Sequence, residues 1–298
     1  MGTMTVRSLA RWCSVVLLLL AALVGPAPTA SATTMTEIYG RASGPGNARA
    51  HVLVSLFTTD WVFIRSVKST RGGVYRMTDV PAGTYRLQFS DLRPRWDVSS
   101  YATTDAVVTV PEGVPTLMKN VRLDKGAFFY GTVKVAGKPG RKALVRAVSQ
   151  YGVTYETQAN AAGEFALGGL PRGGYSVFAY DRRNRYAGTS IWVRKLTAAK
   201  PRGLRIRLDT RAAAYTGFLM VGDAPYRGSV WVTVVNAKTG QFWVKKVVDG
   251  DLSVFRGLYP GAYRLQIPAT DQTRGQTVVL PPAKAGKVRS VNVWADPA

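Results

Sequence analysis

The sequence predicts an all-β chain of three tandem β-sandwich domains that follow a signal peptide. Three observations lead to this: hydrophobic residues alternate along short segments, one turn-forming segment recurs three times, and 30 glycines and 16 prolines are spread over 298 residues. Alternation is typical of strands with one buried face, and glycine and proline separate such strands. Beyond the signal peptide, no segment shows the spacing of an amphipathic helix.

The first 32 residues have the order of a secretory signal peptide. Two arginines, an apolar run, a helix-breaking pair and a small-residue triplet follow one another: Arg7 and Arg11, residues 14–24, Gly25-Pro26 and Ala30-Ser31-Ala32. We expect cleavage after Ala32. The apolar run is about half the roughly 20 residues that a spanning helix needs, which favours a cleaved signal peptide over the alternative of a membrane anchor. We expect no membrane span after the signal peptide is removed. The only cysteine, Cys13, lies before the run, so no disulfide is expected after cleavage.

A Pro-Gly-Tyr segment marks the three copies of the repeat. Its glycines, Gly83, Gly173 and Gly261, are separated by 90 and then 88 residues. This period matches a small β-sandwich, and it predicts domains over 33–125, 126–211 and 212–298. Proline fixes φ and glycine accepts a positive φ, so the segment is interpreted as a structural turn from which the tyrosine re-enters the sheet. The predicted turn residues are Pro81, Gly83, Tyr85, Pro171, Gly173, Tyr175, Pro260, Gly261 and Tyr263.

Within each copy, the strands follow the same order. The predicted first strands cover 37–41, 128–135 and 215–221; the second strands cover 50–56, 143–148 and 230–235; the last strands cover 121–123, 204–208 and 288–293. Alternation assigns one face of the second strands and of the strands after the turns to the core. These predicted core residues are Val52, Val54, Val145, Ala147, Val232 and Val234, then Tyr85, Leu87, Phe89, Tyr175, Val177, Ala179, Tyr263, Leu265 and Ile267.

These patterns resemble carboxypeptidase regulatory-like, prealbumin-like β-sandwich repeats, which are relatives of Cna protein B-type domains and of starch-binding-like folds. The second copy carries the resemblance best, through Gly131-Thr132-Val133, the turn 160–165 and the segment 169–175. The first and third copies match more loosely. The resemblance implies immunoglobulin-like or prealbumin-like sandwiches of seven or eight strands that serve as spacers, stalks or binding modules without catalytic residues. It indicates the fold more than the task.

Basic residues outnumber acidic ones 40 to 17, and the excess is concentrated in the middle copy. Residues 127–212 hold 16 basic and 4 acidic side chains, a net charge of +12. We predict that a basic patch here binds an anionic cell-envelope polymer or polysaccharide, through Arg182, Arg183, Arg185, Tyr186, Arg194 and Lys195. The alternative is a merely solvated surface. No nucleic-acid-binding module is recognised, and the high net charge favours a monomer.

A second hypothesis assigns carbohydrate binding to two tryptophans. Trp231 and Trp243 flank the turn 236–241, and the core face of these strands was assigned to Val232, Val234, Phe242 and Val244. Both indoles are then expected to face solvent, where they would stack on sugar rings. The alternative is that one of them covers a sheet edge or packs between copies.

Catalysis has little support in the sequence. His51 is the only histidine, and strand alternation directs it away from the core, so neither a triad nor a zinc site is predicted. No nucleotide-binding or nucleophile-elbow motif is present, and we expect no metal and no cofactor. The sequence therefore favours a non-catalytic, secreted or cell-wall-associated protein with an adhesive or structural role, in contact with envelope polymers or protein partners. An enzyme of unknown type is the third hypothesis.

Overall fold

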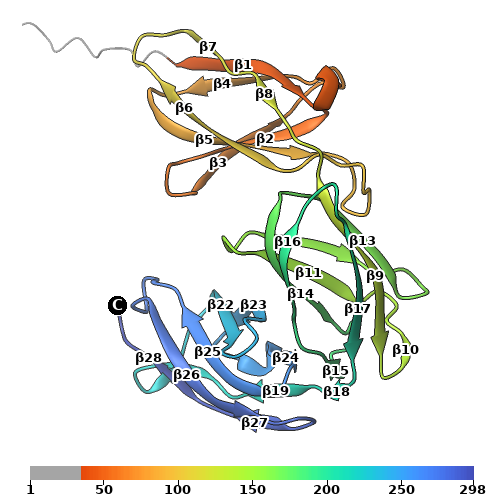
Figure 1. Cartoon of the computed structure of the whole chain (residues 1–298). Coiled ribbons are helices and arrows are strands. Elements are labelled where there is room, and N and C mark those ends of the chain that lie inside the picture. The colour runs from red at the N-terminus through yellow and green to blue at the C-terminus, as the bar shows by residue number, and fades with distance from the viewer. Residues whose placement is uncertain (1–34) are drawn as a thin grey trace, which may run out of the picture. The chain divides into compact units, whose positions relative to one another are not determined.

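The structure of the protein is a computed structural model that describes residues 35–298, and these residues form an all-β chain (Figure 1). The all-β prediction is confirmed, since the described residues hold only two short 3-10 helices, η1 (Pro45–Asn47) and η2 (Leu252–Val254). The predicted signal peptide at 1–32 lies outside the described residues. The described residues belong to one compact unit, and the division into three domains stays a prediction.

Two four-stranded sheets enclose the first hydrophobic cluster, and we call this part the first sandwich. One sheet has the order β4-β1-β7, with β8 also paired to β1, and the other has the order β3-β2-β5-β6. The strands are β1 (Thr36–Ser43), β2 (Val52–Phe57), β3 (Phe63–Lys68), β4 (Val74–Val80), β5 (Gly83–Asp91), β6 (Thr104–Val110), β7 (Thr116–Met118) and β8 (Val121–Arg122). Side chains such as Ile38, Leu56 and Phe89 fill the space between the sheets.

The second sandwich has the same plan. Its sheets have the orders β10-β9-β13, with β17 paired to β9, and β12-β11-β14-β16. The strands are β9 (Ala127–Val135), β10 (Lys138–Pro139), β11 (Leu144–Ser149), β12 (Thr154–Gln158), β13 (Glu164–Leu170), β14 (Gly173–Tyr180), β16 (Ile191–Leu196) and β17 (Arg202–Leu208). A small separate sheet joins β15 (Tyr186–Ala187) to β18 (Thr210–Arg211).

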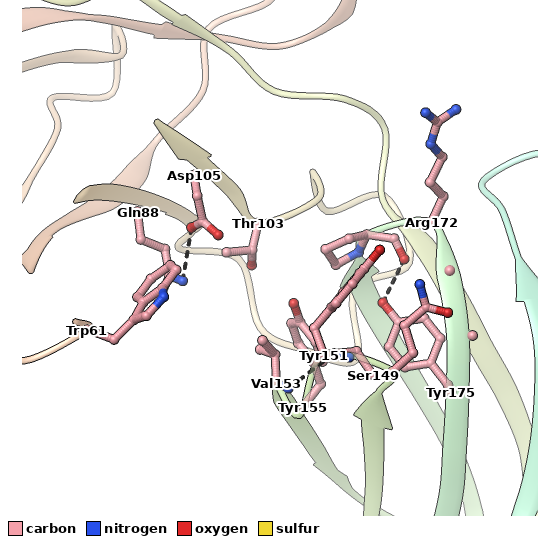
Figure 2. Close-up of a pocket in the computed structure, with 14 residues that line it drawn as sticks. Trp61, Gln88, Thr103, Asp105, Ser149, Tyr151, Val153, Tyr155, Arg172 and Tyr175 are labelled. Carbon is pink, nitrogen blue, oxygen red and sulfur yellow. Dashed lines mark hydrogen bonds between the residues drawn. The ribbon is translucent and has the colours of Figure 1, made fainter. Parts of the chain in front are cut away.

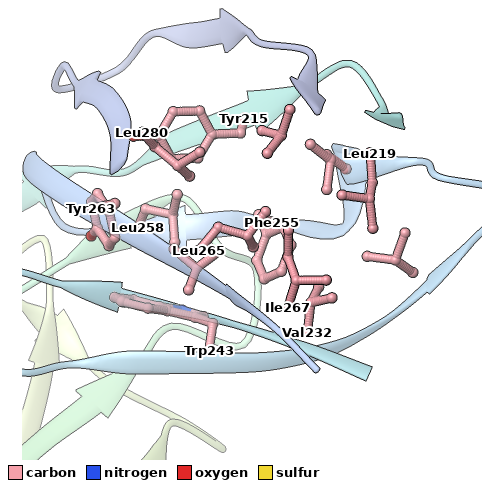
Figure 3. Packing of buried hydrophobic residues seen from close by; sticks show 14 of the residues in the cluster. Tyr215, Leu219, Val232, Trp243, Phe255, Leu258, Tyr263, Leu265, Ile267 and Leu280 are labelled. Carbon is pink, nitrogen blue, oxygen red and sulfur yellow. The ribbon is translucent and has the colours of Figure 1, made fainter. Parts of the chain in front are cut away.

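The third sandwich places the four-stranded sheet β23-β22-β25-β26 opposite two three-stranded sheets, β24-β19-β27 and β21-β20-β28. The strands are β19 (Ala213–Thr216), β20 (Leu219–Val221), β21 (Ala224–Pro225), β22 (Ser229–Asn236), β23 (Phe242–Val248), β24 (Arg256–Leu258), β25 (Gly261–Ile267), β26 (Gln276–Ala283), β27 (Val288–Ser290) and β28 (Val293–Ala295). Figure 3 shows Phe255, Leu265 and Tyr215 packed together in its core.

Two predicted strands of the third copy are each interrupted. The segment 215–221 is divided into β19 and β20 at Gly217, and the segment 288–293 is divided into β27 and β28. Gly217 has a φ of +112°, and a Cβ atom there would lie 2.1 Å from the Val291 carbonyl oxygen. The two strands therefore approach too closely at this point for a regular ladder, and the Asn292 side chain instead accepts a hydrogen bond from the Phe218 N–H at 3.1 Å.

The predicted core faces of the second strands and of the strands after the turns are confirmed. The second-strand residues Val52, Val54, Val145, Ala147, Val232 and Val234 are fully buried. Among the residues that follow the turns, all are buried except Tyr85, which is half-buried. Alternation identified these residues because each of the strands β2, β11 and β22 has one face on the core.

The recurrent turns share one hydrogen bond. The Tyr85 hydroxyl donates to the Pro81 carbonyl at 3.1 Å, and the hydroxyls of Tyr175 and Tyr263 donate four residues back at 2.6 and 2.5 Å. The glycines two residues before the tyrosines have φ values of +151°, +156° and +149°. In the third copy the acceptor is Tyr259, because Pro260 is displaced by one position. The shared element is therefore the glycine-tyrosine corner and not the proline.

Candidate functional site

Five exposed basic side chains surround a cleft of about 290 Å³ in the second sandwich. Arg182, Arg183 and Arg185 come from the turn after β14, as the sequence indicated. Lys138 and Arg141 come from the β9–β10 hairpin and the segment after it. None of the five forms an ion pair with another residue in the described part of the chain.

Asp181 is the acidic residue that lines this basic cleft, and its carboxylate is hydrogen-bonded to the backbone. Its carboxylate accepts hydrogen bonds from the N–H groups of Arg183 at 3.1 Å, Arg185 at 2.9 Å and Tyr186 at 3.2 Å. Asp181 is buried, so its charge is directed into the turn while the arginine side chains point outward. Asp91, which lies 90 residues earlier, shapes the corresponding turn in the first sandwich by accepting from the N–H groups of Arg93 and Tyr101.

The structure separates the remaining residues of the predicted basic patch from this cleft. Tyr186 is half-buried beneath Arg211, whose guanidinium lies 4.9 Å from the centre of the tyrosine ring. Arg194 and Lys195 are exposed on β16, whose Leu196 pairs with Gly173 at the start of β14. The arginine turn follows the other end of β14, about 25 Å away at roughly 3.3 Å per residue. The patch is therefore divided into two groups, and its binding role stays a prediction.

The expected exposure of Trp243 is wrong. Trp231 is 62% exposed, but Trp243 is only 6% exposed and lies in the core of the third sandwich (Figure 3). Trp243 pairs directly with Val234 across the β22–β23 hairpin. Direct partners in an antiparallel pair share a face, so Trp243 shares the core face of Val234, whereas Val244 is exposed and Phe242 is half-buried. The two tryptophans cannot form a joint platform for a sugar.

The turn beside Trp243 packs against the second sandwich. Arg146 and Tyr180 both donate hydrogen bonds to the Phe242 carbonyl, the former at 3.0 Å. The Tyr180 ring lies 5.4 Å from that of Trp243, and Gln241 donates from its amide to the Gly188 carbonyl at 2.7 Å. Burial raises the pKa of Tyr180, and the nearby Arg146 charge opposes this shift. These side chains pack much of the junction and leave a cleft of about 120 Å³ beside Arg146, Tyr180 and Trp243.

A second cleft, of about 370 Å³, lies between the first and second sandwiches (Figure 2). Trp61, Gln88 and Asp105 line it from the first sandwich, and Tyr151 and Tyr175 line it from the second. Partial burial raises the pKa of Asp105, while a hydrogen bond from Gln88 and the charge of Arg86 act in the opposite direction. We call this the junction cleft. None of the residues predicted to bind a ligand lines it.

The other predicted features are quickly placed. His51 is exposed, as alternation predicts, in a depression beside Arg93 and Asp91. Arg93 binds the Asp91 carboxylate at 2.5 Å, which lowers the pKa of Asp91 against the effect of its burial. Within residues 35–298, no three His, Cys, Asp or Glu side chains cluster as metal ligands would. In that same range no helix is long and apolar enough to cross a membrane.

No family model and no curated protein matches the chain. Solved structures do match it. The chain is similar to the Bacillus anthracis TIE protein at 11% identity and a TM-score of 0.26, with 88% of this chain covering 51% of that one, about half its length. It is also similar to the shaft pilin SpaA of Lactobacillus rhamnosus GG (10% identity, 58% of this chain, 97% of that chain, TM-score 0.27). A third similar structure is GBS52, the minor pilin of Streptococcus agalactiae (9% identity, 58% of this chain, 94% of that chain, TM-score 0.29). Likeness at this level transfers no property to the chain.

Proposed function

We propose that the chain is a non-catalytic exported protein that binds anionic cell-envelope polymers through the basic cleft of the second sandwich. One observation carries the proposal: two segments about 40 residues apart in sequence bring five exposed basic side chains around one cleft. The acidic residue among them, Asp181, accepts hydrogen bonds from three backbone N–H groups.

The chemistry of these side chains suits repeated phosphate or carboxylate groups. A guanidinium presents its donors in a planar fork that matches both groups. Clustered exposed cations repel one another, so an anion that enters the cleft relieves this repulsion and lowers the free energy. The surrounding segment 127–212 adds to the attraction with its net charge of +12 from 16 basic and 4 acidic residues. A polymer, which places many charges along one chain, uses such a surface better than a single small anion does.

The expected export of the chain favours a cell-envelope polymer as the polyanion. The signal-like pattern of residues 1–32 supports export, and an exported chain meets teichoic-type polymers or acidic polysaccharides of the envelope before it meets nucleic acid. We therefore propose a secreted or cell-wall-associated location and an adhesive or structural role. Protein partners with an acidic surface would use the same basic cleft.

Sedimentation with purified glycerol-phosphate teichoic acid tests the proposal. The variant Arg182→Gln/Arg183→Gln/Arg185→Gln should lose most of the binding. The control Lys246→Gln/Lys284→Gln/Lys287→Gln removes the same charge from exposed positions of the third sandwich and should retain it. Wild-type binding should weaken steeply with added salt, because polyanion association releases counterions. Equal losses in the two variants would show that net charge acts without a site and would overturn the proposal.

A further inference from the structure

The two junctions between sandwiches have equivalent positions but are packed to different extents. Phe178 of β14 is fully buried and contacts Phe242 of the third sandwich, with ring centres 6.2 Å apart. The equivalent residue 90 positions earlier is Gln88 of β5, since β5 and β14 pair in the same way with β2 and β11. Gln88 faces the open junction cleft. The same fold therefore packs aromatic rings into one junction, which keeps a cleft of about 120 Å³, and leaves a larger, partly polar cleft of about 370 Å³ in the other.

Backbone hydrogen bonds join the first sandwich to the second through residues that do not line the junction cleft. The Gly168 N–H donates to the Arg95 carbonyl at 2.6 Å, and the Gly126 N–H donates to the Ser100 carbonyl at 3.0 Å. A Cβ atom at Gly168 would lie 2.3 Å from the Asp97 carbonyl oxygen, so this contact depends on glycine. The Arg95 guanidinium also lies 5.3 Å from the ring centre of Tyr155, which lines the cleft. The two sandwiches are thus joined by direct contacts, one of which reaches a residue that lines the cleft.

An oriented indole forms part of the first wall. Trp61 lies in the β2–β3 connection with a φ of +65°, an uncommon value for a residue other than glycine, and it stays 44% exposed. Phe57 contacts its ring edge-on at 5.4 Å, and the Arg86 guanidinium lies 5.0 Å from the ring centre. Residues with such strained backbone angles cluster at active sites and ligand-binding sites.

An exposed phenol lies across from it. Tyr151 occupies the β11–β12 turn, 90 residues after Trp61, and is 81% exposed. The Ser149 hydroxyl accepts from the N–H groups of Tyr151 and Val153, and Gly152 takes a φ of +81° to close the turn. Figure 2 shows Tyr151 between the wall that carries Trp61 and the buried Tyr175. The turn therefore displays the ring without burying it.

Between the aromatic rings lies a polar pair. Gln88 donates from its amide to the Asp105 carboxylate at 3.1 Å, and both side chains stand on the sheet face that lines the cleft (Figure 2). The amide keeps a second N–H and its carbonyl, and the carboxylate keeps further acceptor positions. Vicinal hydroxyl groups, which both donate and accept, match such a pair. The Arg172 side chain extends away from this pair in Figure 2.

We infer that the junction cleft binds a neutral oligosaccharide, with sugar rings against Trp61 and Tyr151 and hydroxyl groups on Gln88 and Asp105. A sugar ring has one apolar C–H face and a rim of hydroxyls, which is the complement of aromatic walls around a polar pair. The cleft volume of about 370 Å³ equals roughly a dozen waters at about 30 Å³ each, enough for one or two rings. This second site is independent of the proposed basic cleft.

Isothermal titration of the purified chain tests the inference with three probes: cellotriose, maltotriose and the trimer of N-acetylglucosamine. At least one should bind with a millimolar or lower Kd, and Tyr151→Ala should weaken it about tenfold, as for the loss of one stacking partner. Gln88→Ala should also weaken it. The control Trp294→Ala removes an indole that is 60% exposed in the third sandwich, and it should leave the Kd unchanged.

Three results would overturn the inference. The first is that none of the probes binds at about 10 mM, a concentration at which even weak sites respond. The second is that a probe binds the Tyr151→Ala variant as well as the wild type. The third is that binding disappears with added salt and in the Arg182→Gln/Arg183→Gln/Arg185→Gln variant. The last result would assign the sugar to the basic cleft. Tyr151 is exposed and lies in a turn, so the Tyr151→Ala variant should fold.

Discussion

The three glycine-tyrosine corners offer a graded test of what one hydroxyl contributes. Replacing Tyr175 by phenylalanine keeps the ring, which is 1% exposed, and removes only the hydrogen bond of 2.6 Å to the Pro171 carbonyl. A typical intramolecular hydrogen bond contributes about 0.5–1.5 kcal/mol net, so Tyr175→Phe should lower the free energy of unfolding by about 1 kcal/mol. Tyr263→Phe should cost a similar amount, because its bond to Tyr259 is equally short and its ring equally buried.

Tyr85→Phe is the internal control for this series. Its hydrogen bond is longer, at 3.1 Å, and its acceptor Pro81 is exposed, so water replaces the hydroxyl. The loss should be below about 0.5 kcal/mol, as for most surface changes.

Urea unfolding followed by tryptophan fluorescence and by circular dichroism measures all three variants. If the copies unfold as separate domains, each variant should shift one transition and leave the other two unchanged. The reasoning is refuted if Tyr85→Phe costs as much as Tyr175→Phe, because the corner hydroxyl would then act regardless of burial.

Two further predictions concern the third sandwich. Trp243→Ala should lower the free energy of unfolding by about 3–5 kcal/mol, as a cavity in a core does, while Trp231→Ala should change it by less than about 0.5 kcal/mol in the same urea assay. If Trp243 were exposed, both substitutions would change the free energy of unfolding by similarly small amounts. Burial also raises the pKa of Tyr215 from 10.0 to about 12. The unfolded chain then loses this proton first, so Tyr215 should leave the stability unchanged below about pH 10 and should contribute a fall of up to about 1.4 kcal/mol per pH unit above it. Urea midpoints across this range should show a shallower fall in Tyr215→Phe, and an unchanged slope would contradict the assignment.

Much of the fold follows from local patterns. The second strands could be predicted because Val52, Val145 and Val232 begin alternating runs with one face on a core, and the structure buries all three. The corner could be found because it needs a glycine with positive φ before a buried tyrosine, which leaves a fixed spacing in the sequence. These features depend on residues close together in the chain.

Features that depend on the pairing of distant residues could not be predicted in the same way. Trp243 was assigned to the wrong face because a hairpin register that differs by one residue reverses every side chain of the strand, and the turn length alone did not fix that register. Lys138 and Arg141 join the arginine turn through the sheet arrangement and not through their sequence position. One signal was available for the junction cleft: Trp61 and Tyr151 repeat the 90-residue period of the glycines.

In each sandwich, the first strand runs parallel to the last. In the second sandwich, β9 and β17 pair in parallel along seven consecutive positions, from Phe129 with Arg202 to Val135 with Leu208. Tension on the two chain ends of that sandwich therefore pulls β9 and β17 in opposite directions along their common length. The backbone hydrogen bonds between them are loaded together in shear and do not open one after another, so this ladder resists stretching as a mechanical clamp.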